Sequence, residues 1–580
     1  MRATAPLLVL LAPLALAACD DRPAVVIPDA SVTDAATSDL GADVRANTDA
    51  GTPTDTPAVV DDVPPLDVPA TLEAFDPSPR GSFPPGFLWG SATAPYQVEG
   101  GLHHTDWNAW ENMAGRIAHG DHADDGPRSY TQFTQELDAL VATHQNAYRL
   151  GLDWSRIFPT RDAWSRCFGA RTMPLADFTA ACRAAADPDG LAYYHRVLDA
   201  MAQRHLVPMV TLFHFVLPDY LDDLSQPYDS TGFVRDGIVD DFGAWSRFAG
   251  AEYGRQVDWW ITFNEPLVIA AGGYLESIFP PGAPLDFNRV RRLVLNMIRS
   301  HGRGYDALHE ADTFTAAGND ADGGVGSTGG RPAMVSIASH NRVFRAARPG
   351  NADDERAAVS GAYINNALFL NAIVRGDLDV DADGSLDGPT DVRNDPSLRA
   401  RADFIGLNYY GLTLMRGIPS LPILHGLPQQ TSLPTPLPKS DLDWDLYPQG
   451  FLLVLRELRP YGLPVLVTEN GIADASGTNR PRYLAEHLAI LARAIREGMD
   501  VRGYFHWSII DNFEWAEGYC PRFGLYTVDY TDPMRHRSPT PGADTLRTII
   551  DANQVSDALL GSVPAYHPPQ LCHPRVDAGM

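Results

Sequence analysis

Two glutamates lie at the ends of apolar runs in this chain. Glu265 belongs to the segment ITFNEP (261–266), directly after Trp259 and Trp260, and Glu469 ends the run PVLVTE. An ionised carboxylate in apolar surroundings is costly unless it is paired or takes part in chemistry. For Glu265 alone a surface turn is the simpler interpretation, because Asn and Pro favour turns. Two such carboxyls facing each other could instead cleave a glycosidic bond, with one protonated and the other ionised at the same pH.

Other residues would hold these two carboxyl groups in different protonation states. Arg149 offers a cation and Tyr410 a phenol donor to Glu469. Both stabilise the ionised form that a nucleophile requires. Glu265 has aromatic neighbours in sequence and would face the charge of Glu469. Both features raise the pKa of a carboxyl, as a general acid requires.

These side chains need a scaffold that brings distant parts of the chain to one site. From about residue 80 onward, short apolar runs alternate with helical patterns, and the runs lack strict alternation, as parallel strands buried on both faces do. The eight runs span residues 87–94, 147–154, 207–214, 257–263, 333–338, 403–410, 464–469 and 501–507. Eight strand–helix units predict a single closed (β/α)8 TIM barrel with loop insertions, and an open doubly wound sheet is the alternative.

In a barrel of this kind the catalytic groups lie at the carboxyl ends of the strands. The chemically suggestive residues each lie near or just past a predicted strand end. They are Gln97, Arg149, His214, Asn264, Glu265, Tyr410, Glu469 and Trp507. Eight such placements favour one common site over chance.

The helical patterns carry their own start and stop signals. Ser129 and Gln132 predict a capping box at the start of one helix. Leu484, Leu488, Leu491 and Ile495 form an apolar stripe on another helix, and Gly498 is expected at its C-cap position.

Four stretches closely resemble signatures of glycoside hydrolase family 1. They are FLWGSATAPYQVEG (87–100), TFNEP (262–266), VTENG (467–471) and DNFEWAEG (511–518). The resemblance covers the chain from about residue 83 to about residue 550. Within the family it leans towards the archaeal-type β-glycosidases, on the basis of TDW (105–107), WSRIFP (154–159), PPG (280–282) and RFG (522–524).

Carried over position by position, the resemblance implies roles for the candidate residues. Glu265 would be the general acid and base and Glu469 the nucleophile, steadied by Arg149 and Tyr410. The implied activity is that of a retaining, exo-acting β-glycosidase, which forms a covalent glycosyl–enzyme intermediate. It would need no organic cofactor and no catalytic metal.

The resemblance also implies a sugar-binding pocket. Asn264 would hold the sugar 2-hydroxyl and Trp507 would lie under the ring, where the sugar presents an apolar C–H face. The other hydroxyls would be bound by Gln97, His214, Glu514 and Trp515. Glu514 would repel a sugar 6-phosphate, so the expected substrate is an unphosphorylated β-glucoside, β-galactoside or oligosaccharide. The chain departs from the family at Phe215, where Trp is usual, and the lost indole donor is expected to loosen selectivity for the sugar.

Two other functions fit the same residues. A catalytically silent barrel could bind sugars at the cell surface, although retention of both Glu265 and Glu469 argues against it. A transglycosylase could use the same site and pass the sugar to an acceptor other than water.

The amino terminus resembles a bacterial lipoprotein signal. Arg2 precedes an apolar run over 7–18, which is too short to span a bilayer and ends in LAAC at Cys19. The resemblance implies removal of 1–18, acylation of the Cys19 thiol, and export to the periplasmic or cell-surface side of a bacterial membrane. An ordinary signal peptide with an incidental cysteine is the alternative.

The rest of the chain divides by composition. Residues 19–80 are rich in Asp, Ala, Thr and Pro and predict a disordered, acidic tether. The barrel is expected over 81–555, followed by a tail over 556–580. The formal net charge of −28 argues against nucleic acid and anionic lipid as partners. Membrane contact is therefore expected only through the lipid anchor.

Four cysteines remain after Cys19 and allow three pairings. Cys167 and Cys182 are expected to pair with each other, because both fall in one apparent insertion. The other two are Cys520 and Cys572, and free buried thiols are the alternative to disulfides at all four positions. An exported protein meets an oxidising compartment, which permits disulfides.

The segment DVDADGSLD (379–387) matches the start of a calcium-binding loop. Its acidic residues fall on ligand positions: Asp379, Asp381, Asp383 and Asp387. Thr390 replaces the bidentate Glu of a complete loop, so a weak structural Ca²⁺ site and a solvated acidic loop are both open.

Overall fold

The computed structural model describes residues 72–316, 326–417, 426–428 and 435–572. Its centre is a closed barrel of parallel strands, in the order β1-β11-β10-β7-β5-β4-β3-β2. The barrel strands are β1 (Leu88–Ala92), β2 (Ala147–Gly151), β3 (Val207–Thr211), β4 (Trp259–Asn264), β5 (Met334–His340), β7 (Ile405–Tyr409), β10 (Val465–Asn470) and β11 (Val501–Trp507). Each overlaps one predicted run, so the structure confirms the predicted (β/α)8 barrel.

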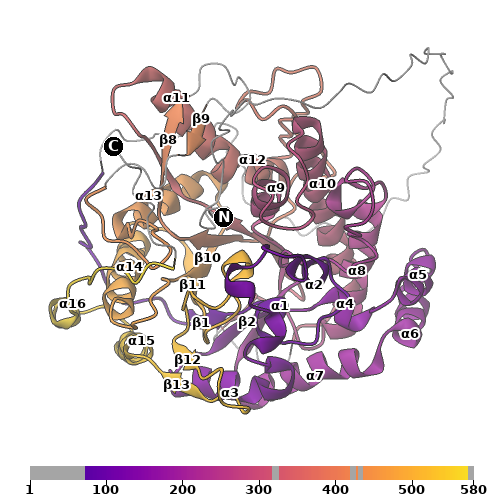
Figure 1. Ribbon diagram of the computed structural model, residues 1–580, viewed down its shortest axis with the longest axis horizontal. Helices are drawn as coiled ribbons and strands as arrows, with labels where there is room; N and C mark the ends of the chain where they lie inside the picture. The colour runs from indigo at the N-terminus through magenta and orange to yellow at the C-terminus, as the bar shows by residue number, and fades with distance from the viewer. Residues whose placement is uncertain (1–71, 317–325, 418–425, 429–434, 573–580) are drawn as a thin grey trace.

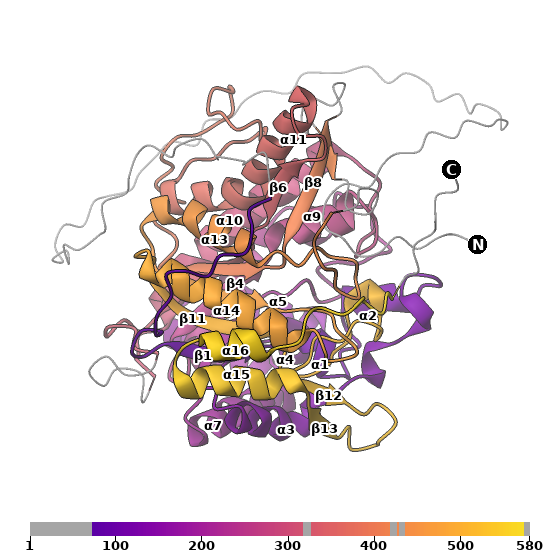
Figure 2. The ribbon, with the colours of Figure 1, turned by 90° about the vertical axis from the view of Figure 1, so that its left-hand side faces the viewer.

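Helices follow the strands, and most of them lie around the outside of the barrel (Figure 1). They are α1 (Pro95–Val98), α2 (Asp106–Glu111), α3 (Ser129–Ala142), α4 (Trp154–Ile157), α5 (Arg161–Gly169), α6 (Leu175–Ala185), α7 (Pro188–Gln203), α8 (Ile238–Tyr253), α9 (Pro266–Tyr274), α10 (Phe287–Ala311), α11 (Ala352–Ala362), α12 (Leu368–Leu370), α13 (Pro448–Leu458), α14 (Arg480–Arg496), α15 (Pro541–Ala552) and α16 (Asp557–Ser562). Figure 2 shows α14, α15 and α16 side by side.

Apolar side chains fill the inside of the barrel. Leu88, Met209, Trp259 and Phe505 are among the residues of this inner cluster, and each is at most 2 % exposed. Gly90 in β1 makes room for the Phe505 ring, because a Cβ at Gly90 would be 2.5 Å from that ring. The barrel interior is therefore packed rather than hollow, and active sites of such barrels lie at the carboxyl ends of the strands.

Two small sheets supplement the barrel. β6 (Val343–Ala346), β8 (Leu412–Gly417) and β9 (Gly426–Pro428) form one, and α11 packs beside it (Figures 1 and 2). β12 (Tyr526–Val528) pairs with β13 (Arg537–Pro539) in the other.

The helical segment Ala352–Arg375 joins β6 to the loop that precedes β7. It contains two π-helical stretches, η4 (Tyr363–Ala367) and η5 (Asn371–Arg375), on either side of α12. By length and composition it could cross a membrane, but 67 % of its most apolar window is buried inside the protein. It therefore packs as a core helix, and π-helical turns of this kind often occur near functional sites.

The predicted helix signals were partly wrong. α3 begins at Ser129, but the capping position is Arg128 in a left-handed backbone conformation (φ 61°), and no side chain caps the helix. The Ser129 hydroxyl donates instead to Glu136 at 2.8 Å, so there is no capping box. The apolar stripe of α14 is confirmed, because Leu484, Leu488 and Leu491 are fully buried and Ile495 is partly buried against the core. The C-cap residue is Glu497, and Gly498 follows it with a φ of 90°.

Segments at both ends of the described chain contact the barrel. The Glu73 backbone N–H donates to the Tyr447 hydroxyl at 2.9 Å. The Arg80 guanidinium donates to the Val555 carbonyl at 2.9 Å. Near the other end, the Tyr566 hydroxyl donates to Glu486 on α14 at 2.9 Å. Residue 19, the predicted lipidation site, lies outside the described residues.

Two disulfides cross-link the described chain. Cys167 on α5 pairs with Cys182 on α6, as predicted, at the edge of the molecule (Figure 1). Cys520, in the segment after β11, pairs with Cys572. The free-thiol alternative is therefore wrong.

Removing each disulfide is expected to lower the free energy of unfolding. The bonded cysteines are 15 and 52 residues apart, and loop-closure entropy then gives about 3 and about 4 kcal/mol for the double variants C167S/C182S and C520S/C572S. Denaturant unfolding of both variants measures this. Equal stability of the C520S/C572S variant and the parent protein, both fully oxidised before the measurement, would contradict it.

Candidate active site

The carboxyl ends of the strands bring the predicted site residues together at one end of the barrel. Arg149, Asn264, Glu469 and Trp507 lie in β2, β4, β10 and β11. Glu265, Tyr410 and His214 follow β4, β7 and β3, and Gln97 lies in α1, after β1. Glu514 and Trp515 lie at the start of η7 (Trp515–Glu517), after β11. Each of these side chains belongs to a residue at most 8 % exposed.

Glu469 is held by the two partners that the sequence predicts. The Arg149 guanidinium donates to Glu469 Oε1 at 2.6 Å, and the Tyr410 hydroxyl donates to Oε2 at 2.8 Å. Arg149 is itself fully buried, and its Nε donates to the Thr211 hydroxyl at 3.0 Å. Both carboxylate oxygens therefore have fixed directions, and both partners favour the ionised form.

Glu265 is aimed by an unusual backbone conformation. Its φ of 43° and ψ of 62° are left-handed, which costs a non-glycine residue roughly 1–3 kcal/mol. A hydrogen bond from the Glu265 N–H to the Ala338 carbonyl on β5, at 2.8 Å, helps to hold this turn. One carboxylate oxygen, Oε1, accepts from the Asn408 amide at 2.7 Å. Oε2 lies 3.7 Å from Nδ1 of His340.

A continuous hydrogen-bonded network joins the two carboxyl groups. Asn264 Oδ1 accepts from Arg149 at 2.7 Å and from Asn408 at 3.1 Å. Arg149 donates to Glu469, and Asn408 donates to Glu265. The positions of the two glutamates therefore depend on the same three side chains.

Burial and charge set the pKa values of the two glutamates apart. Burial, and then the charge of Glu469, raise the pKa of Glu265 to about 8. Burial also raises the pKa of Glu469, but Arg149 and Tyr410 act against it. Glu265 therefore keeps its proton to higher pH than Glu469 does, which is the division of roles that the sequence predicts.

Polar groups with open hydrogen-bonding capacity lie beside this network. The Gln97 amide donates to the Phe513 carbonyl at 2.9 Å and to Glu514 at 3.2 Å, while its Oε1 has no partner among the described residues. His214 Nε2 lies 3.0 Å from the Asn264 amide, and within the described chain His214 Nδ1 is also unpartnered. Buried polar atoms normally have partners, so these atoms fit a ligand rich in hydroxyls.

Aromatic rings form a wall beside these polar groups. The His214 ring stacks with Trp507 and Trp515, with centroids 5.7 and 6.1 Å apart. Phe215 lies 5.2 Å from Trp515 and edge-on to it, in the position where the family usually has Trp. A cyclic sugar needs this combination of apolar rings and polar edges.

Three residues of this region were not predicted from the sequence. Asn408 is one, although it lies at the end of a barrel strand only two residues before Tyr410, so the strand-end rule could have found it. His340 lies two residues past the end of its predicted apolar run. Trp444 lies 5.5 Å from the Tyr410 ring in a segment with no strand or helix pattern, and no sequence signal pointed to it.

The acidic loop after η5 does not support the predicted calcium site. Asp379, Asp381 and Asp383 have carboxylate oxygens within 4.8 Å of one another, but Asp387 is not part of this group. Asp379 already accepts hydrogen bonds from the Tyr363 hydroxyl and from two backbone N–H groups of the loop. Asp387 accepts from the Ser385 hydroxyl at 3.0 Å. Asp379, Asp383 and Asp387 thus each accept hydrogen bonds from donors of the loop itself.

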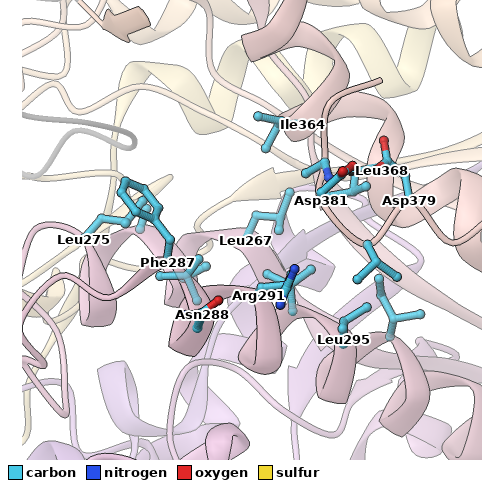
Figure 3. Close-up of a pocket in the computed structure, with 17 residues that line it drawn as sticks. Leu267, Leu275, Phe287, Asn288, Arg291, Leu295, Ile364, Leu368, Asp379 and Asp381 are labelled. Atoms are coloured by element: carbon cyan, nitrogen blue, oxygen red, sulfur yellow. Dashed lines mark hydrogen bonds between the residues drawn. The ribbon is translucent and has the colours of Figure 1, made fainter. Parts of the chain in front are cut away.

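Asp379 and Asp381 also border a pocket between α9 and α10 (Figure 3). Its walls are largely apolar and include Leu267, Leu275, Phe287, Leu295, Ile364 and Leu368. None of the predicted catalytic or sugar-binding residues lines it. It is thus distinct from the network that joins the two glutamates.

Most of this chain is similar to known proteins. Residues 79–167 and 171–555 match the model of glycosyl hydrolase family 1. A β-galactosidase from Pyrococcus woesei is 31 % identical over 495 residues, which are 77 % of this chain and 93 % of that protein. The β-glucosidase A of Thermotoga maritima is 30 % identical over 472 residues, which are 78 % of this chain and 94 % of that protein.

Solved structures are similar over the same region. The family 1 β-glucosidase from Thermotoga maritima has a TM-score of 0.66 at 28 % identity and covers 83 % of this chain and 100 % of its own. The β-glycosidase from Thermosphaera aggregans has a TM-score of 0.71 at 23 % identity, with 84 % and 100 % covered, and supports the fold alone.

Proposed function

The chain belongs to glycosyl hydrolase family 1, and from this premise we propose that this glycoside hydrolase is a retaining, exo-acting β-glycosidase. The observation that carries the proposal is the network from Glu469 through Arg149, Asn264 and Asn408 to Glu265. It gives two facing carboxyls different partners, as double displacement requires.

The proposed reaction has two steps. Glu469 attacks the anomeric carbon and forms an ester to the sugar, while Glu265 gives its proton to the leaving oxygen as that bond breaks. Water then attacks the same carbon, Glu265 takes a proton from it, and the Glu469 ester breaks. Two inversions leave the configuration unchanged, and the carboxyls of such enzymes lie about 5–5.5 Å apart. The chemistry needs no organic cofactor and no catalytic metal.

We propose unphosphorylated β-glucosides and β-galactosides as the substrate class. The relatives named above include a β-galactosidase and a β-glucosidase. Two cations that could hold a phosphate are already paired, Lys439 with Asp445 at 2.7 Å and Arg149 with Glu469. Glu514, beside Gln97, would lie near the sugar hydroxyls instead.

A panel of 4-nitrophenyl glycosides tests the activity. Release of nitrophenol from the β-glucoside or β-galactoside, and not from the 6-phosphorylated forms, is expected. Sugar binding without any release would favour the silent sugar-binding protein. Transfer products that exceed hydrolysis at high acceptor concentration would favour the transglycosylase.

Phe215 is expected to loosen the choice between sugars. The variant F215W restores an indole donor beside Trp515, and one added hydrogen bond changes a rate ratio by about three- to tenfold. We expect F215W to be more selective than the parent protein. The difference between kcat/KM for the 4-nitrophenyl β-glucoside and kcat/KM for the 4-nitrophenyl β-galactoside, expressed as a ratio, should increase by that factor. F168W, on α5, is a distant control. An unchanged ratio in F215W would remove Phe215 from the account.

We also propose that the protein is exported and anchored through Cys19. The two disulfides of the described chain support this, because such bonds persist in oxidising compartments. Metabolic labelling with an alkynyl fatty acid should mark the parent protein, and C19A should lose both the label and membrane association. Labelling of C19A would contradict the proposal.

A further inference from the structure

His340, which the proposed mechanism does not use, is fixed in place by its backbone. It ends β5, and its carbonyl accepts from the Asn365 amide of η4 at 2.6 Å. The next backbone N–H, of Asn341, donates to the Asn408 carbonyl at 3.1 Å. The N–H of Arg342 donates to the Asn366 side chain at 3.0 Å. Two side chains of the π-helical η4 are thus hydrogen-bonded to the backbone of the turn that carries His340.

The His340 ring has no such support. His340 is only 7 % exposed, yet neither ring nitrogen has a hydrogen-bond partner within the described ranges. Its Nδ1 lies 3.7 Å from Oε2 of Glu265, and its ring lies edge-on to the Tyr410 ring, with centroids 6.0 Å apart. Burial, and then the Arg342 charge, hold the pKa of His340 well below its usual range, so the ring is neutral. Two unmet buried polar atoms are costly unless a ligand meets them.

The position of His340 indicates which part of a substrate it would meet. Glu265 Oε1 is occupied by Asn408, so Oε2 is the oxygen free to protonate the leaving group. β5 lies on one side of β4, whereas β3, which leads to His214, lies on the other. Gln97 follows β1 and also lies on the β3 side of β4. Glu514 follows β11, the strand opposite β4, and accepts from the Gln97 amide at 3.2 Å. The leaving group should therefore extend from Oε2 towards His340.

We propose that His340 is part of the leaving-group subsite and selects a leaving group that carries hydroxyls, such as a second sugar, over an apolar one. This inference rests on the proposed function. A neutral imidazole offers one donor and one acceptor, which matches a hydroxyl that both gives and accepts a hydrogen bond. An apolar ring would leave both nitrogens unmet. A site built to bind a hydroxyl discriminates strongly against a group that lacks one.

The test compares leaving groups while the sugar is held constant. Cellobiose and 4-nitrophenyl β-D-glucoside share one glycone, and lactose and 4-nitrophenyl β-D-galactoside share the other. Both disaccharides have glucose as the leaving group. H340F keeps the ring shape and removes both polar atoms. We expect the disaccharide-to-nitrophenyl ratio of kcat/KM to fall by about tenfold or more in H340F.

Two further variants separate binding from folding. H487F removes a buried histidine of α14 whose Nδ1 lies 2.9 Å from the Tyr483 carbonyl, and it should leave the ratio unchanged. H340N restores one donor and one acceptor, so it should recover part of the disaccharide-to-nitrophenyl ratio of kcat/KM. If H340F does not fold, H340N can be compared with the parent protein instead. Equal losses on both substrates in H340F and H340N, or no cleavage of either disaccharide by the parent protein, would overturn the inference. Failure of the proposed function is different: the parent protein would then not cleave the nitrophenyl glycosides either.

Discussion

Replacing Glu469 with alanine is expected to reduce turnover of every glycoside substrate by at least about 10⁴-fold. The variant loses the carboxylate to which both Arg149 and Tyr410 donate hydrogen bonds. No covalent intermediate can then form, and the positive charge that develops at the anomeric carbon is no longer offset. Steady-state kinetics with 4-nitrophenyl β-glucoside and β-galactoside measure the loss.

Rescue of E469A by azide tests whether Glu469 acts as the nucleophile. In E469A a small anion can enter the space left by the carboxylate and attack from that face, so azide should restore activity and give the α-glycosyl azide. E310A, which changes a half-exposed partner of Arg247 far from the site, is the matched control. Near-normal activity of E469A without azide would remove Glu469 from the mechanism.

The second large effect is expected from Glu265. E265A should lower kcat/KM by about 10²–10⁴-fold for substrates with poor leaving groups, because proton transfer to the leaving oxygen is lost. The loss should be much smaller for 2,4-dinitrophenyl glycosides, whose leaving group needs no proton. Azide should now yield the β-glycosyl azide, since the Glu469 ester still forms and is attacked from the opposite face. The same loss for both kinds of leaving group would contradict the assignment.

Glu265 should also set the alkaline limb of the pH profile. Its pKa of about 8 means that kcat/KM falls as pH rises through about 8. E265Q should lack this limb.

Stability should respond with a definite sign. The folded-state pKa of Glu265 lies above the ordinary value of 4.5, so the stability contributed by its protonated form is complete below pH 4.5. That contribution is lost as pH rises through about 8. E265Q cannot ionise, so it should match the parent protein near pH 4.5 and exceed it above pH 8. Melting temperatures of E265Q and the parent protein, measured across this pH range, test the prediction. A difference in melting temperature that does not change with pH would contradict it.

The barrel strands were predictable because parallel strands buried on both faces read as apolar runs, and most of the site followed from the strand-end rule. Ser129 misled the helix prediction because its hydroxyl bonds Glu136 across two turns of the helix rather than capping it. The Cys520–Cys572 bond joins residues 52 apart and had no local signal. Asn408 and His340 show a further limit, because their importance depends on what faces them across the barrel rather than on their neighbours in sequence.

The stereochemistry of the first product tests the central claim most directly. Proton NMR of a 4-nitrophenyl β-glycoside during the first minutes of hydrolysis shows the released sugar before it mutarotates. Two facing carboxyls that act as nucleophile and as acid and base should release the β-anomer first. The α-anomer as first product would mean a single displacement by water, and Glu469 would then not be the nucleophile.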